Sequence, residues 1–274
     1  MEVYNIKKVL NNNVVIAEKE KEELILIGKG IGFDFSKSKE IPEERVENVF
    51  VKQTAAIGEN YQKVLEKIDS SIIGISEEII HLAEKKLNLK LNKAIHVSLP
   101  DHISFALKRL EKGLTIKNPF LRELNILYPT EYNLALHALE IINSRFHSSL
   151  PEDEAGFICL HIKAAITQKD VAQSLDYTKK IGQIVNVIEK LLGKKLEKNS
   201  LVYIRTITHI NFMIERIEED KTIKNHLLDT IKKEFYYEYN LAVKVAMKIE
   251  DLFDLKVPED EIAYIALHLK RLSE

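Results

Sequence analysis

Four histidines occupy matched positions in two copies of one sequence block. Residues 102–161 align without a gap with residues 209–268, and 24 of the 60 aligned pairs are identical. His102 and His161 end the first block, and His209 and His268 end the second. Duplication explains a shared fold, but a shared fold does not need a titratable side chain at both ends of the block. The paired histidines therefore predict a chemical task that is repeated.

Three roles are open to histidines in this pattern. The plainest is a core histidine with a satisfied hydrogen bond, because His161 and His268 lie on the apolar side of their predicted helices. A metal site needs three or four ligands, and the acids that begin the same helices lie two turns away. Phosphorylation is the third role, since a neutral imidazole accepts a phosphoryl group and gains about −1.5 to −2 charges. Such a charge at a helix or domain surface can shift a packing equilibrium.

The residues around the first histidine of each pair are partly repeated. Arg109 and Arg216 follow it by two helical turns, and either meet a phosphate or are ordinary solvated arginines. The preceding residue differs, Asp101 in one copy and Thr208 in the other. A nearby carboxylate raises the basicity of an imidazole, so we expect the copies to differ in donor preference. The other histidines have no histidine partner in the repeat and are interpreted as ordinary: His81, His96, His137, His147 and His226.

Length and composition restrict the class of protein. The chain has 274 residues, 45% hydrophobic and 30% charged, with a net charge of −2, as in a globular protein of two or three domains. No apolar run is long enough to span a membrane and no signal peptide is visible, so we expect a cytoplasmic protein. The single cysteine excludes an internal disulfide and a cysteine zinc cluster.

Residues 1–57 are expected to form a small antiparallel sheet. Residues 14–16 and 24–27 are β-branched or leucine-rich and flank a polar stretch, which predicts a hairpin. A glycine-rich stretch at 28–33 is followed by a predicted polar loop over 34–44 and a strand within 46–51. A lone sheet of this size is marginally stable, so dimerisation is expected.

The rest of the chain has helical periodicity. Two all-α bundles of about five helices each are predicted, at 62–168 and 173–274, joined by a polar linker at 167–177. Proline followed by three acids at 151–154 and at 258–261 predicts a helix start in each copy.

The motifs together resemble the BglG/SacY family of transcription antiterminators over essentially the whole chain. They are the stretch Lys8–Asn13, which ends in three asparagines, the stretch Gly28–Phe33, and Asp101-His102-Ile103 beside the paired histidines. The resemblance implies a co-antiterminator RNA-binding domain at 1–57 and two phosphotransferase-system (PTS) regulation domains after it. A homodimer would bind a hairpin in the leader of a nascent messenger RNA and prevent a terminator from forming.

The resemblance also implies the partners and their sites. The sugar-specific enzyme II of the PTS would phosphorylate His102 and His161 and inhibit the protein. The phosphocarrier protein HPr would phosphorylate His209 and His268 and activate it. The RNA contacts that carry over are Lys8, Asn13, Gly28, Lys29 and Phe33.

These residue types also suit RNA without the resemblance. Phe33 can stack on an unpaired base and Asn13 can read a base edge, while Lys8 and Lys29 can meet phosphates. The plain alternative is a tight turn, a core phenylalanine and surface lysines. Acidic and basic residues are nearly balanced in this N-terminal segment. RNA binding therefore requires a local cluster of basic residues that includes Lys7, and the acids at 18–23 must point away from that cluster.

Two other functions stay open at this point. One is a PTS-regulated transcriptional activator with a different nucleic-acid output, although residues 1–57 show no helix-turn-helix pattern. The other is a metal-dependent helical protein. The sequence shows no nucleophile–base constellation and no phosphate-binding loop before a helix. We therefore expect a regulator rather than an enzyme, with no cofactor and no bound metal.

Overall fold

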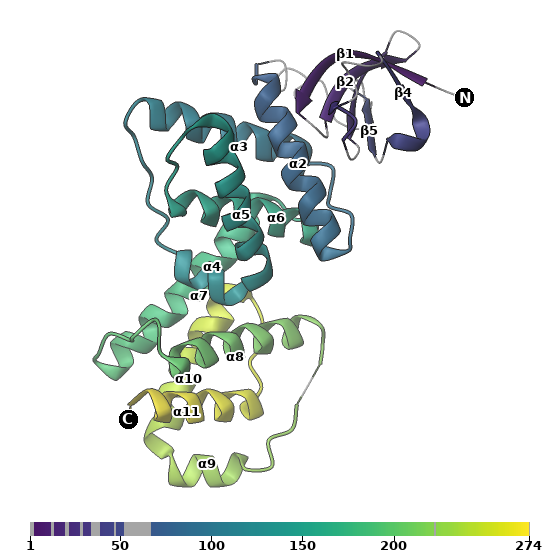
Figure 1. The fold of residues 1–274 in the computed structure, drawn as a ribbon. Helices are drawn as coiled ribbons and strands as arrows, with labels where there is room; N and C mark the ends of the chain where they lie inside the picture. The colour runs from purple at the N-terminus through teal and green to yellow at the C-terminus, as the bar shows by residue number, and fades with distance from the viewer. Residues whose placement is uncertain are drawn as a thin grey trace. The chain divides into compact units, whose positions relative to one another are not determined.

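The computed structural model describes residues 3–11, 14–19, 22–27, 30–33, 39–46, 48–51, 67–221 and 223–273. Strands occupy the N-terminal part, and helices follow from residue 70 onward (Figure 1). This order confirms the predicted fold class, a small all-β domain followed by two all-α helical repeats.

Within the described residues, five strands form one antiparallel sheet with the spatial order β4-β1-β2-β3-β5. They are β1 (Val3–Asn11), β2 (Val14–Lys19), β3 (Glu22–Ile27), β4 (Glu40–Pro42) and β5 (Asn48–Val51), with a 3-10 helix η2 (Glu43–Arg45) after β4. The predicted hairpin is confirmed as β2 and β3. The predicted loop over 34–44 is wrong at β4, a three-residue edge strand. An edge position tolerates Pro42, which has no amide hydrogen to donate.

One face of the sheet is apolar and buried. Side chains alternate between the faces of a strand, and β1, β2 and β3 each bury alternate residues. The cluster consists of Tyr4, Ile6, Val15, Ala17, Leu24, Leu26, Ile31 and Ile41. A bulge in β1 between Ile6 and Lys8 interrupts the alternation, so that Lys7 and Lys8 are both exposed. Without the bulge, Lys8 would point to the buried face.

The chain divides into two compact units, Met1–Asn118 with Thr130–Val171, and Pro119–Pro129 with Ala172–Glu274. The predicted number of helices per copy is confirmed within the described residues. The first copy has α2 (Ser70–Leu87), α3 (Ile95–Glu111), α4 (Leu121–Leu127), α5 (Pro129–Phe146) and α6 (Glu152–Thr167). The second has α7 (Val171–Leu192), α8 (Leu201–Glu218), α9 (Leu228–Glu234), α10 (Tyr236–Phe253) and α11 (Glu259–Ser273).

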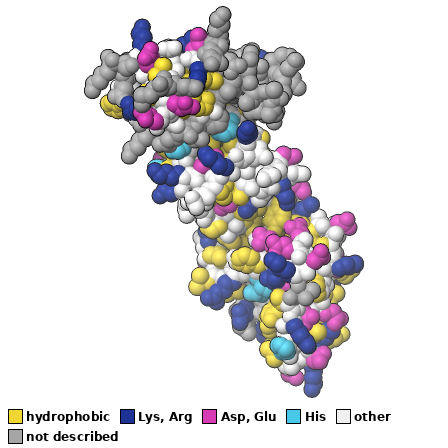
Figure 2. Space-filling model, turned by 90° about the vertical axis from the view of Figure 1, so that its right-hand side faces the viewer, with side chains coloured by type: hydrophobic (Ala, Val, Ile, Leu, Met, Phe, Trp, Pro, Cys, Tyr) yellow, Lys and Arg dark blue, Asp and Glu magenta, His cyan; other side chains and the backbone are white. Residues whose placement is uncertain are grey.

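The predicted linker at 167–177 is wrong from Val171 onward, where α7 begins. This segment is compatible with a helix, and its Ser174 takes part in a hydrogen bond of a kind found inside helices. The Thr178 hydroxyl donates to the backbone carbonyl of Ser174, at 3.0 Å, a bond that side chains of this kind make inside helices. On the face shown in Figure 2, basic and acidic side chains are intermixed, as the small net charge suggests.

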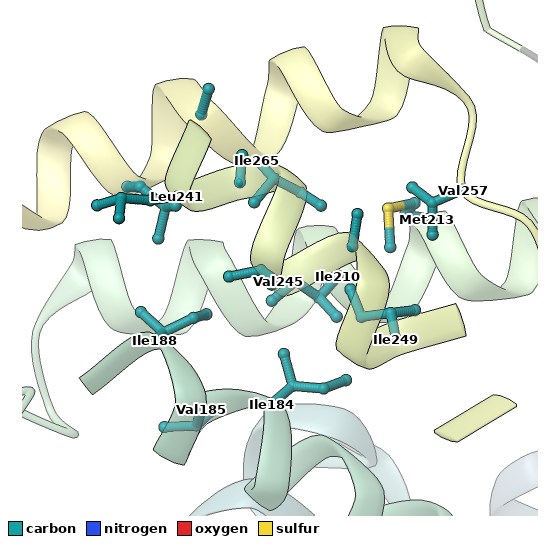
Figure 3. Packing of buried hydrophobic residues seen from close by; sticks show 14 of the residues in the cluster. Ile184, Val185, Ile188, Ile210, Met213, Leu241, Val245, Ile249, Val257 and Ile265 are labelled. Carbon is teal, nitrogen blue, oxygen red and sulfur yellow. The ribbon is translucent and has the colours of Figure 1, made fainter. Parts of the chain in front are cut away.

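The core of the second unit is formed by α7, α8, α10 and α11. Ile184, Ile210 and Val245 are among its fully buried side chains (Figure 3). Helix α4 belongs to the first copy of the repeat but lies in this second unit. Its Leu124 is fully buried, and Ile126 and Leu127 pack against the second unit's core.

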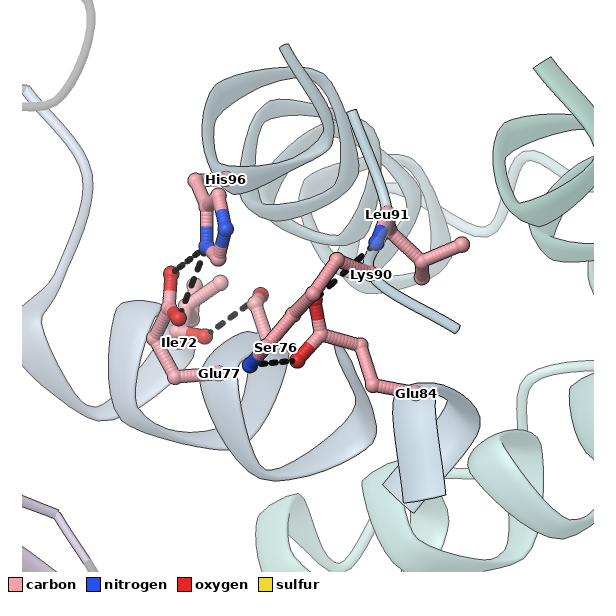
Figure 4. Close-up of polar contacts among 7 residues, drawn as sticks. All are labelled: Ile72, Ser76, Glu77, Glu84, Lys90, Leu91 and His96. Carbon is pink, nitrogen blue, oxygen red and sulfur yellow. Dashed lines mark hydrogen bonds and ion pairs between the residues drawn. The ribbon is translucent and has the colours of Figure 1, made fainter. Parts of the chain in front are cut away.

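A glutamate fixes the chain after α2 and after its counterpart α7. Glu84 Oε1 accepts the backbone N–H of Leu91 at 3.0 Å (Figure 4), and Glu189 Oε1 accepts that of Leu196 at 3.0 Å. The bond spans seven residues in both copies. These bonds anchor the segments that lead into α3 and α8, the helices that carry the first histidine of each pair.

Candidate functional site

The structure brings the two histidines of each pair together within one unit. His102 on α3 and His161 on α6 have ring centroids 5.1 Å apart, with planes inclined by 39°. His209 on α8 and His268 on α11 have centroids 4.6 Å apart, inclined by 35°. All four side chains are partly buried. The repeat therefore preserves a local arrangement as well as the residue types.

A buried carboxylate lies beside the first histidine of each pair. Glu154 Oε2 is 3.2 Å from His102 Nε2, and Glu261 Oε2 is 3.9 Å from His209 Nε2. The two glutamate side chains are only 3% and 2% exposed. Sequence reasoning judged these acids poorly placed because they lie two turns from the second histidine of each pair. That judgement concerned a metal site with the second histidine, and it did not anticipate that each acid faces the first histidine from the neighbouring helix.

The two repeated arginines bind these carboxylates. Arg109 Nη2 donates to Glu154 Oε1 at 2.6 Å. Arg216 donates to Glu261 Oε1 twice, from Nη2 at 2.7 Å and from Nε at 3.2 Å. Neither arginine is therefore the solvated side chain that was the simpler expectation. One sequence signal could have revealed this contact. The Pro-Glu-Asp-Glu segment is identical in both copies, although a helix start does not require the same acid at each position.

The carboxylate in contact with His102 is thus Glu154, and Asp101 is exposed. Burial alone would raise the pKa of Glu154, but its contacts with His102 and Arg109 outweigh burial and hold the pKa below its usual value. Glu154 is therefore an anion at neutral pH, beside an imidazole that can donate to it.

Burial makes His161, His209 and His268 weak bases. It lowers the pKa of His161 to about 3, and the neighbouring His102 contributes. Burial, with contributions from His268 and Arg216, lowers the pKa of His209 to about 4. Burial and then Arg271 lower the pKa of His268. These three imidazoles are neutral at physiological pH, and each keeps a lone pair that can act as a nucleophile.

Aromatic side chains accompany each pair. The His102 ring lies 5.8 Å from that of Phe157, and the His209 ring lies 5.7 Å from that of Tyr264, centroid to centroid. One helical turn after each first histidine, a phenylalanine points to solvent. Phe105 is 58% exposed and its counterpart Phe212 is 54% exposed.

The two clusters differ in charge. Ser98 in the first copy, whose hydroxyl lies 3.1 Å from His161 Nδ1, corresponds to Arg205 in the second. Ala164 corresponds to Arg271. Both arginines are exposed, and no ion pair joins either of them to another described residue. Arg271 acts electrostatically on His268, and the corresponding position of the first copy carries no charge.

A further buried histidine–carboxylate contact lies elsewhere in the first unit. His96 Nδ1 is 2.9 Å and 2.8 Å from the two carboxylate oxygens of Glu77 (Figure 4). At the position that matches His96 in the repeat, Tyr203 donates its hydroxyl to Glu123 at 2.9 Å. Both contacts join helices, as expected of structural residues. Within the described ranges, no three His, Cys, Asp or Glu side chains gather in a geometry that could hold a metal ion.

Two of the five predicted RNA contacts can be placed. Lys8 is exposed on β1, and Phe33 is 71% exposed, so Phe33 is not a core residue. The turn that presents Phe33 contains Gly30 at φ +71°, and the Phe33 amide donates to the Gly30 carbonyl at 3.0 Å. Glycine is suited to that backbone angle. Asn13, Gly28 and Lys29 lie outside the described residues.

The expected cluster of bases is partly neutralised. Lys7 forms an ion pair with Glu18 across the β1–β2 pair. The expectation that all acids of 18–23 turn away from the lysines is therefore wrong for Glu18.

None of the described helices is both long and apolar enough to span a membrane.

Comparisons with known proteins match the chain from end to end. Residues 4–58 match the model of the CAT RNA binding domain, and residues 77–165 and 182–272 each match that of the PRD domain. Transcription antiterminator LicT of Bacillus subtilis (strain 168) is 34% identical over 271 residues, covering 97% of this chain and 98% of LicT. The PtsGHI operon antiterminator of the same strain is 38% identical over 273 residues, covering 98% and 97%. The Beta-glucoside operon antiterminator of Dickeya chrysanthemi is 30% identical over 275 residues, covering 97% and 96%.

Proposed function

The chain belongs to the BglG/SacY family of transcription antiterminators, and we propose how its histidines and its sheet carry out that function. It is a regulator of sugar-operon transcription that combines RNA binding with control by the PTS. We assign residues 1–57 to RNA binding, and residues 62–168 and 173–274 to the two regulation domains. The active form in this proposal is a cytoplasmic homodimer that binds a hairpin in the messenger RNA leader.

One observation carries the assignment of the regulatory sites. Both helical copies bring two histidine rings together at a tilted angle and place a buried, arginine-bound glutamate beside the first histidine. A neutral imidazole is the form that attacks phosphorus, and burial keeps His161, His209 and His268 neutral. We assign His102, His161, His209 and His268 as phosphoryl acceptors.

The difference in charge between the clusters supports two different donors. The second copy has Arg205 and Arg271 at the positions where the first copy has Ser98 and Ala164, and Arg271 acts on His268. Positive groups stabilise the negative charge of a phosphoryl group during transfer. The second pair is therefore suited to a donor whose transfer depends on this stabilisation by the acceptor. We assign HPr to the second pair, with activation as the outcome, and the sugar-specific enzyme II to the first pair, with inhibition.

The RNA contacts in the proposal are Lys8 and Phe33, which are exposed, together with Asn13, Gly28 and Lys29. An exposed phenylalanine on a glycine turn suits stacking on an unpaired base. The exposed Lys8 on β1 suits a phosphate. The bulge in β1 supports this role, because it turns Lys8 away from the buried face.

Labelling of the full-length chain tests the regulatory sites. The chain is incubated with radiolabelled phosphoenolpyruvate, enzyme I and HPr. The double variant His209→Ala/His268→Ala is expected to lose the HPr-dependent label, and His102→Ala/His161→Ala to keep it. The matched control is His137→Ala/His147→Ala, which removes two unrepeated histidines and should label normally. Undiminished label in the His209/His268 variant would contradict the assignment.

Binding of the same full-length chain to RNA tests the output. Binding to a bulged hairpin from the leader of its operon is compared with binding to a scrambled-loop RNA. Phe33→Ala is expected to weaken binding to the hairpin by about tenfold or more, since a stacked base contributes roughly 1–3 kcal/mol. Val49→Ala is the control, because Val49 is another exposed apolar residue of the sheet, at 41%. Equal, salt-sensitive binding to both RNAs would leave the sheet domain without its proposed role.

A further inference from the structure

Glu154 is the residue of the first cluster that the phosphorylation assignment leaves without a role. Its carboxylate is almost completely buried, and its two oxygens have different partners. Oε1 accepts the 2.6 Å hydrogen bond from Arg109. Oε2 lies 3.2 Å from His102 Nε2, and neither of these two atoms has a hydrogen-bond partner elsewhere in the described chain. The two atoms are within hydrogen-bond distance of each other.

The charge on Glu154 decides which way that bond runs. Because Glu154 is ionised, Oε2 can only accept a hydrogen bond. A buried carboxylate oxygen without a donor is costly, and His102 Nε2 is the atom in position to supply one. His102 therefore carries its proton on Nε2, and Nδ1 holds the lone pair. Nε2 is also the buried ring nitrogen. The phosphoryl donor protein therefore approaches His102 from the Nδ1 side.

We propose that Glu154 is a positioning residue for phosphoryl transfer, which fixes His102 as the Nε2–H tautomer and makes Nδ1 the phosphoryl acceptor. The inference rests on the proposed function, because it assumes that His102 is phosphorylated. The Nδ1 lone pair attacks the phosphorus of the donor's phosphorylated side chain, and the new N–P bond forms. The donor's bond to phosphorus breaks, and its electron pair stays on the donor atom. The proton on Nε2 stays there, and Glu154 offsets the positive charge that the ring gains.

The second cluster resembles the first only in part, because its buried ring nitrogen without a hydrogen-bond partner is His209 Nδ1, whereas in the first cluster it is His102 Nε2. Glu261 Oε2 is 3.9 Å from His209 Nε2, beyond hydrogen-bond distance. Both contacts of Arg216 go to Glu261 Oε1, one of them from Nε, whereas Arg109 Nε has no hydrogen-bond partner in the described chain. The carboxylate thus engages the arginine more and the histidine less in the second copy. The effect of Glu261 on His209 is expected to be smaller than that of Glu154 on His102.

The tautomer can be measured without any phosphorylation. The full-length chain is labelled with 15N-histidine, and long-range 1H–15N spectra show which ring nitrogen carries the proton. His102 is expected as Nε2–H, and Glu154→Gln is expected to give a mixture of tautomers or the Nδ1–H form. Glu77→Gln is the matched control, because Glu77 is as buried as Glu154 and touches a different histidine, His96. It should leave His102 unchanged. An Nδ1–H tautomer in the parent chain would overturn the inference.

Phosphorylation then tests the role in transfer. A chain that keeps His102 but carries alanine at His161, His209 and His268 is labelled by the donor system. 31P and 15N spectra identify the phosphorylated nitrogen. The parent is expected to give the Nδ1 isomer. Glu154→Gln is expected to slow labelling on the order of tenfold to a hundredfold and to yield some Nε2 isomer. In a chain that keeps only His209, Glu261→Gln should have a smaller effect.

The possible outcomes distinguish an error in the role of Glu154 from an error in the proposed phosphorylation of His102. A merely structural role for Glu154 would lower the yield of folded protein or the rate but leave the isomer unchanged. The Nε2 isomer in the parent overturns the inference even if Glu154→Gln does not fold. Labelled His102 with the same isomer and rate in Glu154→Gln overturns the inference alone. Absence of any label on His102 in the parent overturns the proposed function as well.

Discussion

Arg109 donates a 2.6 Å hydrogen bond to Glu154 across 45 residues of sequence, and both side chains are nearly buried, at 12% and 3% exposed. The bond joins α3 to the first turn of α6. A buried ion pair adds little net stability, but removing one partner leaves an uncompensated charge. This hydrogen bond holds the carboxylate beside His102. Breaking it should lower the free energy of unfolding by a measurable amount.

Arg109→Met is therefore expected to lower the free energy of unfolding of the first unit by about 3–5 kcal/mol. Arg109→Met/Glu154→Leu should recover most of that loss, because no buried charge remains. Urea unfolding followed by circular dichroism measures both. A double variant as unstable as the single one would show that packing of the arginine, rather than charge, is what matters.

His161 is expected to stay neutral in the folded chain far below the usual pKa of histidine. Its pKa is about 3, against about 6.5 in an unfolded chain. The unfolded state therefore binds the proton more readily. The contribution of His161 to stability is complete above about pH 6.5 and is lost as the pH falls from there towards 3.

NMR titration checks this directly. The ring resonances of His161 should not change between pH 8 and pH 5 in the folded chain, and should titrate near pH 6.5 when the chain is unfolded in urea. His161→Gln should lose less stability than the parent between pH 7 and pH 5. A folded-state midpoint near 6 for His161 would contradict the burial argument.

The bond between Tyr203 and Glu123 is expected to stabilise the attachment of α4 within the second unit. Tyr203 donates to the Glu123 carboxylate at 2.9 Å, and that carboxylate is 3% exposed and also binds Lys198. Tyr203→Phe should lower the free energy of unfolding of this unit by roughly 1–3 kcal/mol, because a buried acceptor loses a donor. Tyr236→Phe, at a side chain that is 70% exposed, is the control. Equal effects from the two substitutions would argue against a structural bond.

The exposed phenylalanines beside the histidines are expected to contact the phosphoryl donors. Phe105→Ala should slow labelling of the first pair only, and Phe212→Ala labelling of the second pair only. Stability should change by less than about 1 kcal/mol, since both side chains are solvent-exposed, although the Phe105 ring also lies 4.8 Å from the Arg109 guanidinium. Met247→Ala, at another residue exposed to 63%, should leave both rates unchanged. Initial labelling rates of each variant, measured with each phosphoryl donor, test this prediction.

The arginines of the second cluster are expected to promote transfer to it. Arg205→Ser/Arg271→Ala installs the residues of the first copy and should slow HPr-dependent labelling of His209 and His268 by about tenfold at low ionic strength. The difference should shrink as salt is added. Lys256→Ala removes a positive charge from an exposed loop side chain and should have little effect. An unchanged rate in the double arginine variant would mean that charge does not distinguish the two pairs.

Much of the architecture follows from local patterns in the sequence. The hairpin of β2 and β3, the helix starts after Pro151 and Pro258, and the five helices of each copy all depend on residues close together in the chain. Where patterns are ambiguous, the prediction failed. A three-residue edge strand looked like a loop, and the polar first turns of α7 looked like a linker. In both places hydrogen bonds, rather than hydrophobic periodicity, define the element.

The sequence by itself determined the duplication, the fold class, the four paired histidines and the family. These rest on residue identities and short-range spacing, which are read along the chain. Only the tertiary structure decided which groups surround each histidine. Glu154 reaches His102 from a helix 52 residues later, whereas the adjacent Asp101 points to solvent. The packing of α3 on α6, and of α8 on α11, also sets the difference between 3.2 Å and 3.9 Å in the two copies. Helix packing fixes such distances through many side chains at once, and no pair of residues in the sequence encodes them.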